Sequence, residues 1–247
     1  MTGPALRLTG AAKTYPTGTV ALAPASFEIA RGSFVSLVGP SGCGKSTLLR
    51  LLAGLLAPSE GEVSRGTDIS QTGFVFQDAT LMPWANVRAN VALPLTLKGK
   101  SDAGVPDTLR RVGLEGFAQA YPRELSGGMQ MRASIARAIV TGPQLLLMDE
   151  PFAALDEFTR FRLNDDLLAL WQQNQWTVVF VTHSIREAVF LSQRVIVMSP
   201  RPGRVIADVA IDLPERRDEA LRGSHVFADR CAKIGALLRG AMTGEAA

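Results

Sequence analysis

Several residue types that mark particular protein classes are scarce in this chain of 247 residues. Its only two cysteines, Cys43 and Cys231, lie far apart in the sequence, which excludes a disulfide framework and a cysteine-rich metal cluster. The 26 basic and 23 acidic residues nearly balance and are interleaved, so charge gives no reason to expect nucleic acid as a partner. We therefore expect a protein that binds no nucleic acid.

Long apolar runs are also missing. The longest, Leu48–Ala57, is interrupted by Arg50 and is far shorter than the roughly 20 residues that cross a bilayer. The first ten residues lack a basic stretch followed by an apolar core, as an export signal would have. We expect a cytoplasmic protein whose contact with any membrane goes through a partner.

What the sequence does contain is a glycine-rich phosphate-binding motif, GPSGCGKST. It lies between an apolar run, Phe34–Val38, and a predicted helix, Lys45–Leu56, and this context favours a phosphate-binding loop over an ordinary glycine-rich turn. Glycines let backbone N–H groups point at phosphate oxygens, and the helix directs its positive end at the same charge. Lys45 is expected to reach the β- and γ-phosphates and Ser46 to bind Mg²⁺. The predicted loop comprises Gly39, Pro40, Ser41, Gly42, Cys43, Gly44, Lys45, Ser46 and Thr47.

A pair of carboxylates follows a second apolar run. Asp149 ends LLLMD and is expected to hold Mg²⁺ through water, while Glu150 is placed to orient or deprotonate an attacking water. Alone, the pair could be a solvated acidic turn, but the upstream phosphate loop favours the metal site.

The segment LSGGM distinguishes one class of phosphate-binding protein from the others. Ser126, Gly127 and Gly128 open a predicted helix, Met129–Val140, with exposed N–H groups, which alone would indicate only a helix cap. In combination with GPSGCGKST and LLLMDE in this order, the segment resembles the ATP-binding-cassette ATPases over about residues 5–225. Met129 stands where many members of that family have glutamine.

The resemblance implies roles for four further residues and the cofactors ATP and Mg²⁺. Tyr15 would stack on adenine, Gln77 would sense Mg²⁺ and join the core to a helical lobe, Asp156 would lie in a loop that crosses between subunits, and His183 would contact the γ-phosphate. The implied catalytic residues are Glu150, His183 and Gln77. The implied metal ligands are Ser46, Gln77 and Asp149.

The predicted fold is α/β, with a P-loop NTPase core, a mostly parallel sheet, an N-terminal antiparallel β subdomain and an inserted helical subdomain. Continuous apolar runs predict buried strands, Asp156 is the expected N-cap of a helix, and Ser184 to Glu187 predicts a capping box. The predicted strands of the core are Phe34–Val38, Leu145–Met148, Thr177–Thr182 and Val195–Met198. The predicted division is an antiparallel β subdomain over residues 1–35, a core over 36–76 and 141–225, a helical subdomain over 77–140, and a C-terminal helix and tail over 226–247.

The resemblance also implies partners. Two copies, or one copy and a paralogous subunit, would enclose two ATP molecules, and the dimer would serve integral membrane permease subunits from the cytoplasmic face of the inner membrane, with an extracytoplasmic solute-binding protein in the complex. The strings LMPWANVRANVALPL and DEPFAALDEFTR resemble importers of nitrate, sulfonate, taurine and pyrimidine precursors. Trp84 and its neighbours belong either to the core of the helical lobe or to the permease contact, and we favour the contact.

Other interpretations are a non-transport cassette ATPase, an exporter or lipid-transporter ATPase, a small-molecule kinase or GTPase, and a non-catalytic scaffold. The segment between Lys45 and Asp149 contains no heptads, unlike DNA-repair cassettes, and no guanine-reading Asn-Lys-x-Asp is present. Glu150 and His183 argue against the scaffold. Cys43, at a helix N-terminus, is either a small spacer or a thiol with a lowered pKa.

Overall fold

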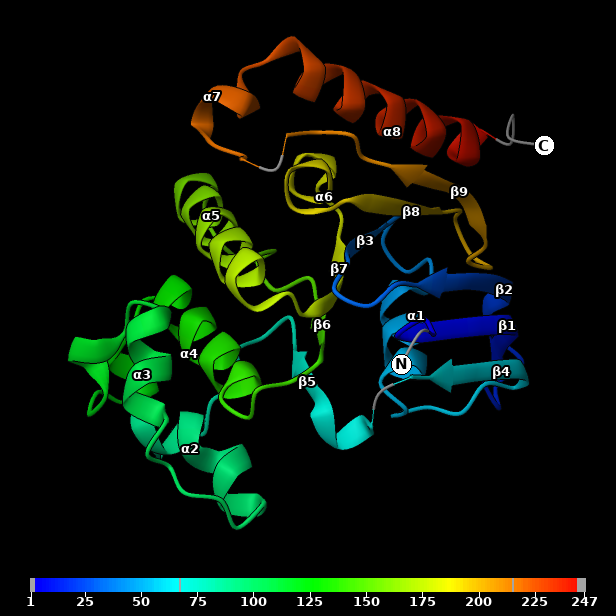
Figure 1. Cartoon of the computed structure of the whole chain (residues 1–247). Helices are drawn as coiled ribbons and strands as arrows, with labels where there is room; N and C mark the ends of the chain where they lie inside the picture. Colours follow the sequence, from blue (N-terminus) through cyan, green and yellow to red (C-terminus); the bar gives the residue numbers. More distant parts are fainter. Residues whose placement is uncertain (1–2, 67, 215, 244–247) are drawn as a thin grey trace.

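Two β-sheets organise the computed structural model of the chain, which describes residues 3–66, 68–214 and 216–243 (Figure 1). The smaller is antiparallel with the order β2-β1-β4, formed by β1 (Leu6–Thr14), β2 (Val20–Ile29) and β4 (Glu60–Arg65). The predicted P-loop core includes residues 36–76. The structure corrects this boundary for β4, which belongs to the antiparallel sheet. Its charged sequence EGEVSR is mostly exposed and pairs with β1 rather than with an apolar core strand.

The larger sheet has six strands in the order β5-β6-β7-β3-β8-β9. The first five run parallel, which confirms the predicted mostly parallel sheet, and β9 is antiparallel to β8. Strands β3, β6 and β7 are buried along their whole length, as their continuous apolar sequences predict. The strands are β5 (Thr72–Val75), β6 (Leu145–Asp149), β7 (Thr177–Thr182), β3 (Phe34–Val38), β8 (Arg194–Met198) and β9 (Val205–Ala210).

Each face of the large sheet has its own core. Along β3, Phe34 and Val38 join the core beneath α5 (Glu157–Asn174), α6 (Ile185–Leu191) and α8 (His225–Thr243). Val35 and Leu37 face the other way, toward α1 (Lys45–Leu52) and the antiparallel sheet. Helix α1 ends earlier than the predicted Leu56, because Gly54 adopts φ 73° just after it, a conformation that terminates helices.

A helical lobe is inserted between β5 and β6 and lies apart from the antiparallel sheet (Figure 1). It contains α2 (Val87–Leu97), α3 (Val105–Arg111), α4 (Gly127–Ile139) and three-residue 3₁₀ turns at Glu115–Phe117 and Pro122–Glu124. A third such turn, Ile69–Gln71, precedes β5. Helix α4 starts two residues before the predicted Met129, because the Ser126 side chain already caps it.

The C-terminal region adds α7 (Glu219–Arg222) and α8, which packs against α6 through the buried Phe227. A C-terminal helix is therefore present where the sequence predicts one, and it begins at His225, one residue before the predicted boundary. In the described part of the chain, none of the helices is both long and apolar enough to cross a membrane.

Candidate functional site

Four segments singled out from the sequence follow the carboxyl ends of neighbouring strands. The phosphate loop follows β3, Glu150 follows β6, His183 follows β7, and Gln77 lies two residues beyond β5. Because these strands are parallel, their carboxyl ends lie at one edge of the sheet. Ligands of open α/β sheets bind at this edge, so the fold gathers the predicted groups where a site is expected.

The backbone of the phosphate loop depends on glycine. Gly44 has φ 102°, and a Cβ atom there would lie 2.3 Å from the Ala21 carbonyl oxygen, so no other residue fits. The buried Lys45 ammonium donates to the carbonyls of Gly39 (2.9 Å) and Pro40 (3.0 Å). These bonds hold the cation inside the loop at the N-terminus of α1, where no acidic side chain occupies the first turn.

Ser46 and Asp149 form a pair suited to a hard cation. The Ser46 hydroxyl donates to Asp149 Oδ1 over 2.8 Å. Burial raises the pKa of the Asp149 carboxyl, the Ser46 hydrogen bond lowers it, and the neighbouring Glu150 charge raises it. A hydroxyl and a carboxylate side by side are oxygen ligands of the kind that Mg²⁺ binds, so the donor set fits a magnesium ion.

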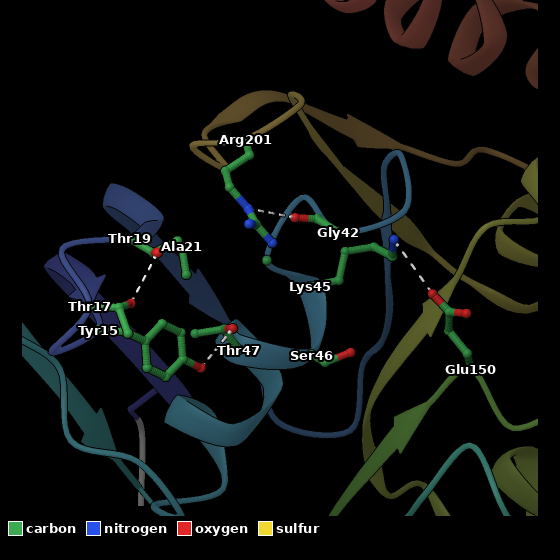
Figure 2. A pocket seen from close by; sticks show the side chains of 11 residues that line it. Tyr15, Thr17, Thr19, Ala21, Gly42, Lys45, Ser46, Thr47, Glu150 and Arg201 are labelled. Carbon is green, nitrogen blue, oxygen red and sulfur yellow. Dashed lines mark hydrogen bonds and ion pairs between the residues drawn. The ribbon is translucent and has the colours of Figure 1, made fainter.

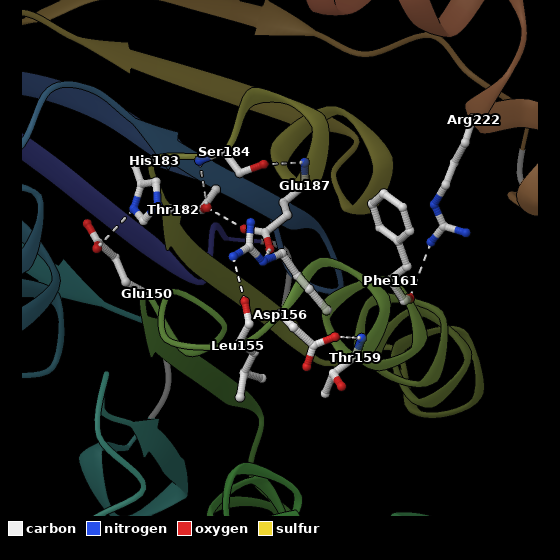
Figure 3. Close-up of polar contacts among 11 residues, drawn as sticks. Glu150, Leu155, Asp156, Thr159, Phe161, Thr182, His183, Ser184, Glu187 and Arg222 are labelled. Carbon is white, nitrogen blue, oxygen red and sulfur yellow. Dashed lines mark hydrogen bonds and ion pairs between the residues drawn. The ribbon is translucent and has the colours of Figure 1, made fainter. Parts of the chain in front are cut away.

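Glu150 lies between two nitrogen groups. Its Oε1 is 3.5 Å from Lys45 Nζ and its Oε2 is 3.3 Å from His183 Nδ1 (Figures 2 and 3). Its backbone is in the left-handed region at φ 48°, a strained conformation that is held by its N–H bond to the Val181 carbonyl on β7. From this backbone the Glu150 side chain extends to Lys45 of the phosphate loop.

A cavity opens between the antiparallel sheet and the phosphate loop (Figure 2). Tyr15 borders it, with its hydroxyl 3.2 Å from Thr47 Oγ1. Arg201 borders it as well and donates from Nε to the Gly42 carbonyl over 3.1 Å. Arg201 is not recognisable from the sequence as a residue of this cavity, because an arginine in a proline-rich turn matches no motif. The cavity is lined by Tyr15, Thr17, Thr19, Ala21, Gly42, Gly44, Lys45, Ser46, Thr47, Glu150 and Arg201.

Several other predicted residues do not line this cavity. Gln77 is exposed in a bend. Ser126 accepts a hydrogen bond from the Met129 N–H as the cap of α4, and it borders a separate depression together with Gly128 and Phe158. In a single chain, LSGGM therefore does not meet the phosphate loop.

Asp156 caps α5, as predicted. Its carboxylate accepts from the Thr159 N–H over 2.9 Å, and that bond lowers the pKa of this exposed carboxyl (Figure 3). The predicted capping box at Ser184 is only half formed. The Ser184 hydroxyl accepts from the Glu187 N–H, but the Ser184 N–H donates to the Thr182 hydroxyl rather than to the Glu187 carboxylate.

The buried Glu187 links His183 to the loop before α5. Its carboxylate accepts from the Thr182 hydroxyl, at the end of β7, and lies 3.5 Å from the Arg160 guanidinium. Arg160 in turn donates to the Leu155 carbonyl over 2.8 Å. Burial raises the pKa of Glu187, and the Thr182 hydrogen bond and the Arg160 charge lower it. The cluster thus connects the strand end that carries His183 to the loop that carries Asp156.

The hypothesis that Cys43 has a lowered thiol pKa is wrong. Cys43 is 1 % exposed, and burial raises its pKa by more than Lys45 lowers it. We therefore expect iodoacetamide to label Cys43 slowly in a Cys231→Ser variant, where Cys43 is the only thiol. The rate should climb with pH beyond the point at which an ordinary thiol is fully ionised. Mass spectrometry of the labelled chain measures it, and labelling at neutral pH as fast as a small free thiol would contradict the burial argument.

Comparisons with known proteins agree with this geometry. A family model described as ABC transporter matches residues 22–153. A putative ATP-binding protein of Brucella abortus is 47% identical over 220 residues, covering 85% of each chain. The aliphatic sulfonates import ATP-binding protein SsuB of Bacillus cereus is 46% identical over 210 residues, covering 82% of this chain and 84% of that one.

The solved structures that resemble this chain are also ABC transporter cassettes. CbiO1 from Clostridium perfringens, part of an ABC transporter complex, has a TM-score of 0.76 at 28% identity and covers 84% of this chain and 88% of its own. A dimeric bacterial ABC transporter cassette has a TM-score of 0.74 at 34% identity and covers 85% of this chain and 100% of its own. A post-hydrolysis state of that cassette, bound to ADP and Pi, matches equally.

Proposed function

This chain belongs to the ABC transporter family and is one of its ATPase subunits, and from that premise we propose that it powers import of a small anionic solute of the sulfonate class through a membrane permease. The observation that carries the solute class is the 46% identity to sulfonate-import subunits over 82% of the chain. Nitrate and pyrimidine precursors are the alternative solutes, because the sequences around Trp84 and Asp156 also resemble the importers of those solutes.

We assign the phosphate loop and Lys45 to the triphosphate of ATP, and Tyr15 to its adenine. Ser46 and Asp149 would hold Mg²⁺, with Gln77 approaching from β5. The support is the 2.8 Å Ser46–Asp149 contact beside the buried Lys45. Bound there, magnesium would neutralise charge on the phosphate oxygens.

Hydrolysis would use Glu150 as the base. The carboxylate accepts a proton from a water whose oxygen attacks the γ-phosphorus, while the bond from that phosphorus to the bridging oxygen breaks and ADP leaves. His183, 3.3 Å from Glu150, is placed to orient the carboxylate and the γ-phosphate. Lys45 faces Glu150 at 3.5 Å and would exchange this partner for phosphate when ATP binds.

The complete site would require a second copy of the chain or a paralogous subunit. Ser126, Gly127, Gly128 and Asp156 lie outside the cavity that holds Lys45, so within one chain they cannot reach the same phosphate. Placed opposite the phosphate loop of a partner, the N–H groups of α4 would bind the γ-phosphate. The dimeric state of the similar cassette supports this arrangement.

A turn in the helical lobe is the proposed permease contact. Trp84 is 77 % exposed at its tip, although tryptophan is seldom left in water. The fully buried Asn90 fixes the turn, since its amide bonds the N–H and carbonyl of Met82 and the carbonyls of Ala85 and Asn86. An exposed apolar side chain on a turn held by these hydrogen bonds is suited to packing against the permease, at the cytoplasmic face of the membrane.

The Trp84→Ser variant is expected to lose co-purification with the permease while keeping ATP hydrolysis by the free dimer. The reason is that Trp84 lies outside the nucleotide cavity and contributes exposed apolar area, worth about 1.5–3 kcal/mol when buried in a partner. Quantitative pull-down from detergent-solubilised membranes measures the effect. Leu97→Ser is the matched control, since Leu97 is 78 % exposed in the same lobe. Equal loss in both variants would contradict a specific contact at Trp84.

The solute class is tested with the complete complex in proteoliposomes. With the permease and the extracytoplasmic solute-binding protein present, an aliphatic sulfonate should stimulate ATP hydrolysis and enter the vesicles. Nitrate and a pyrimidine precursor are the comparison solutes. Stimulation by one of those and not by the sulfonate would reassign the solute, and accumulation on the opposite side of the membrane would overturn import.

A further inference from the structure

The guanidinium of Arg201 lies beside the phosphate loop, and the hydrolysis steps proposed above do not use it. Arg201 lies in the turn Ser199–Arg204 between β8 and β9, and its side chain reaches down to the Gly42 carbonyl (Figure 2). Within the described residues, no carboxylate lies within ion-pair distance of Arg201, and no partner is found for its terminal nitrogens. A guanidinium has five N–H donors, so most of them remain for a ligand.

The turn that carries Arg201 is rigid. Pro200 and Pro202 flank the arginine, and the Ser199 and Arg204 backbones close the turn with an N–H to carbonyl bond of 2.9 Å. Two further bonds attach Gly203 to β2: its N–H donates to the Ala21 carbonyl, and its carbonyl accepts from the Ala23 N–H over 2.9 Å. The arginine backbone is therefore fixed before any ligand binds, which lowers the entropic cost of using it.

The phosphate loop and this turn are also in direct contact. A Cβ atom on Gly203 would lie 2.0 Å from the Cys43 carbonyl oxygen, so only glycine lets the two backbones approach this closely. The approach places Arg201 at the cavity that Lys45 also borders. The contact between Gly203 and Cys43 therefore holds the Arg201 backbone at a set position relative to the phosphate loop.

Charge indicates the ligand. The charged side chains that line the cavity are Lys45, Glu150 and Arg201, two cations and one carboxylate, and α1 adds the positive end of its dipole. Glu150 faces Lys45, which leaves the Arg201 guanidinium without a carboxylate among the described residues and gives the cavity an excess of positive charge. Such an excess favours an anion, and a guanidinium matches phosphate oxygens in a forked geometry.

We propose that Arg201 is a phosphate-binding residue of this site, a second cation that contacts the phosphate chain of the nucleotide opposite Lys45. This rests on the proposed function, since it assumes that the cavity is the ATP site. Arg201 would act on nucleotide affinity rather than on the hydrolytic step, because Glu150 and His183 already supply the groups that face the attacking water.

Titration of nucleotides into the full chain without magnesium, which prevents hydrolysis, tests the proposal. Arg201→Gln should weaken ADP and ATP about tenfold, as expected for a charge-assisted phosphate contact, and Arg201→Lys should recover part of the affinity. Adenosine, measured by competition, should bind both variants as it binds the wild type. The matched control is Arg204→Gln, an exposed arginine of the same turn that does not line the cavity.

Unchanged ADP affinity in Arg201→Gln would overturn the inference. So would an equal loss for adenosine, because the turn would then support the adenine side and not the phosphates. Lys45→Ala separates this outcome from failure of the proposed function. If Lys45→Ala loses ADP while Arg201→Gln does not, only the Arg201 contact is wrong. If Lys45→Ala binds ADP like the wild type, the cavity is not the nucleotide site.

Discussion

The Glu150→Gln variant is expected to bind ATP and to hydrolyse it about 10²–10⁴-fold more slowly than the wild type. The amide keeps the size of the side chain and its contact with His183, but it cannot accept the proton of the attacking water. It also removes the only carboxylate within ion-pair distance of Lys45 in the described residues, so the lysine meets the phosphates without a competitor. Phosphate release measures the rate, and light scattering with saturating ATP and Mg²⁺ should detect a stable dimer.

Glu115→Gln is the control, because this exposed glutamate lies in the helical lobe away from the cavity. Retained hydrolysis in Glu150→Gln would contradict the assignment of the base. A monomeric Glu150→Gln chain under saturating ATP and Mg²⁺ would contradict the two-chain site while leaving the base assignment intact. The two readouts therefore test separate aspects of the proposal.

The sequence was most predictive where local chemistry alone determines structure. FVSLV, LLLMD and TVVFVT are apolar throughout, and a strand buried on both faces needs nothing else to be recognised. The glycines of the phosphate loop are recognisable for a similar reason, because Gly44 has a backbone conformation that other residues rarely adopt. These segments place the phosphate loop, Glu150 and His183 at one edge of the sheet.

It was least predictive where tertiary contacts decide. The sequence of β4 is charged and gives no strand pattern. Only its pairing with β1, at Leu6 and Arg7, shows that it belongs to the antiparallel sheet. Arg201 acquires its position from the approach of Gly203 to the phosphate loop, which no local pattern encodes. The thiol pKa of Cys43 depends on two opposing effects. The helix N-terminus and Lys45 lower it, but burial raises it by more, and the sequence does not show that burial.

Mixing two inactive variants is expected to restore ATP hydrolysis. Lys45→Ala removes the phosphate-binding cation, and Gly127→Asp places a carboxylate where the partner's γ-phosphate would bind. The second substitution is compatible with the fold, since Gly127 is exposed, its Cβ would meet only a Leu155 methyl at 3.4 Å, and aspartate is favourable in the first turn of a helix. Each variant alone should lose about 100-fold or more in activity, the usual effect of removing one charge-stabilising group.

In a mixed dimer the two defects fall in the same site, and the other site combines an intact phosphate loop with an intact LSGGM. Random pairing makes half of the dimers mixed, so about a quarter of wild-type activity should return. Mixing Lys45→Ala with Glu150→Gln is the control, because both defects lie on the same side of the interface and each site keeps one of them. Absence of recovery in the first mixture, with mixed dimers shown to form, would mean that each chain closes its own site. The separation of Ser126 from the Lys45 cavity argues against that outcome.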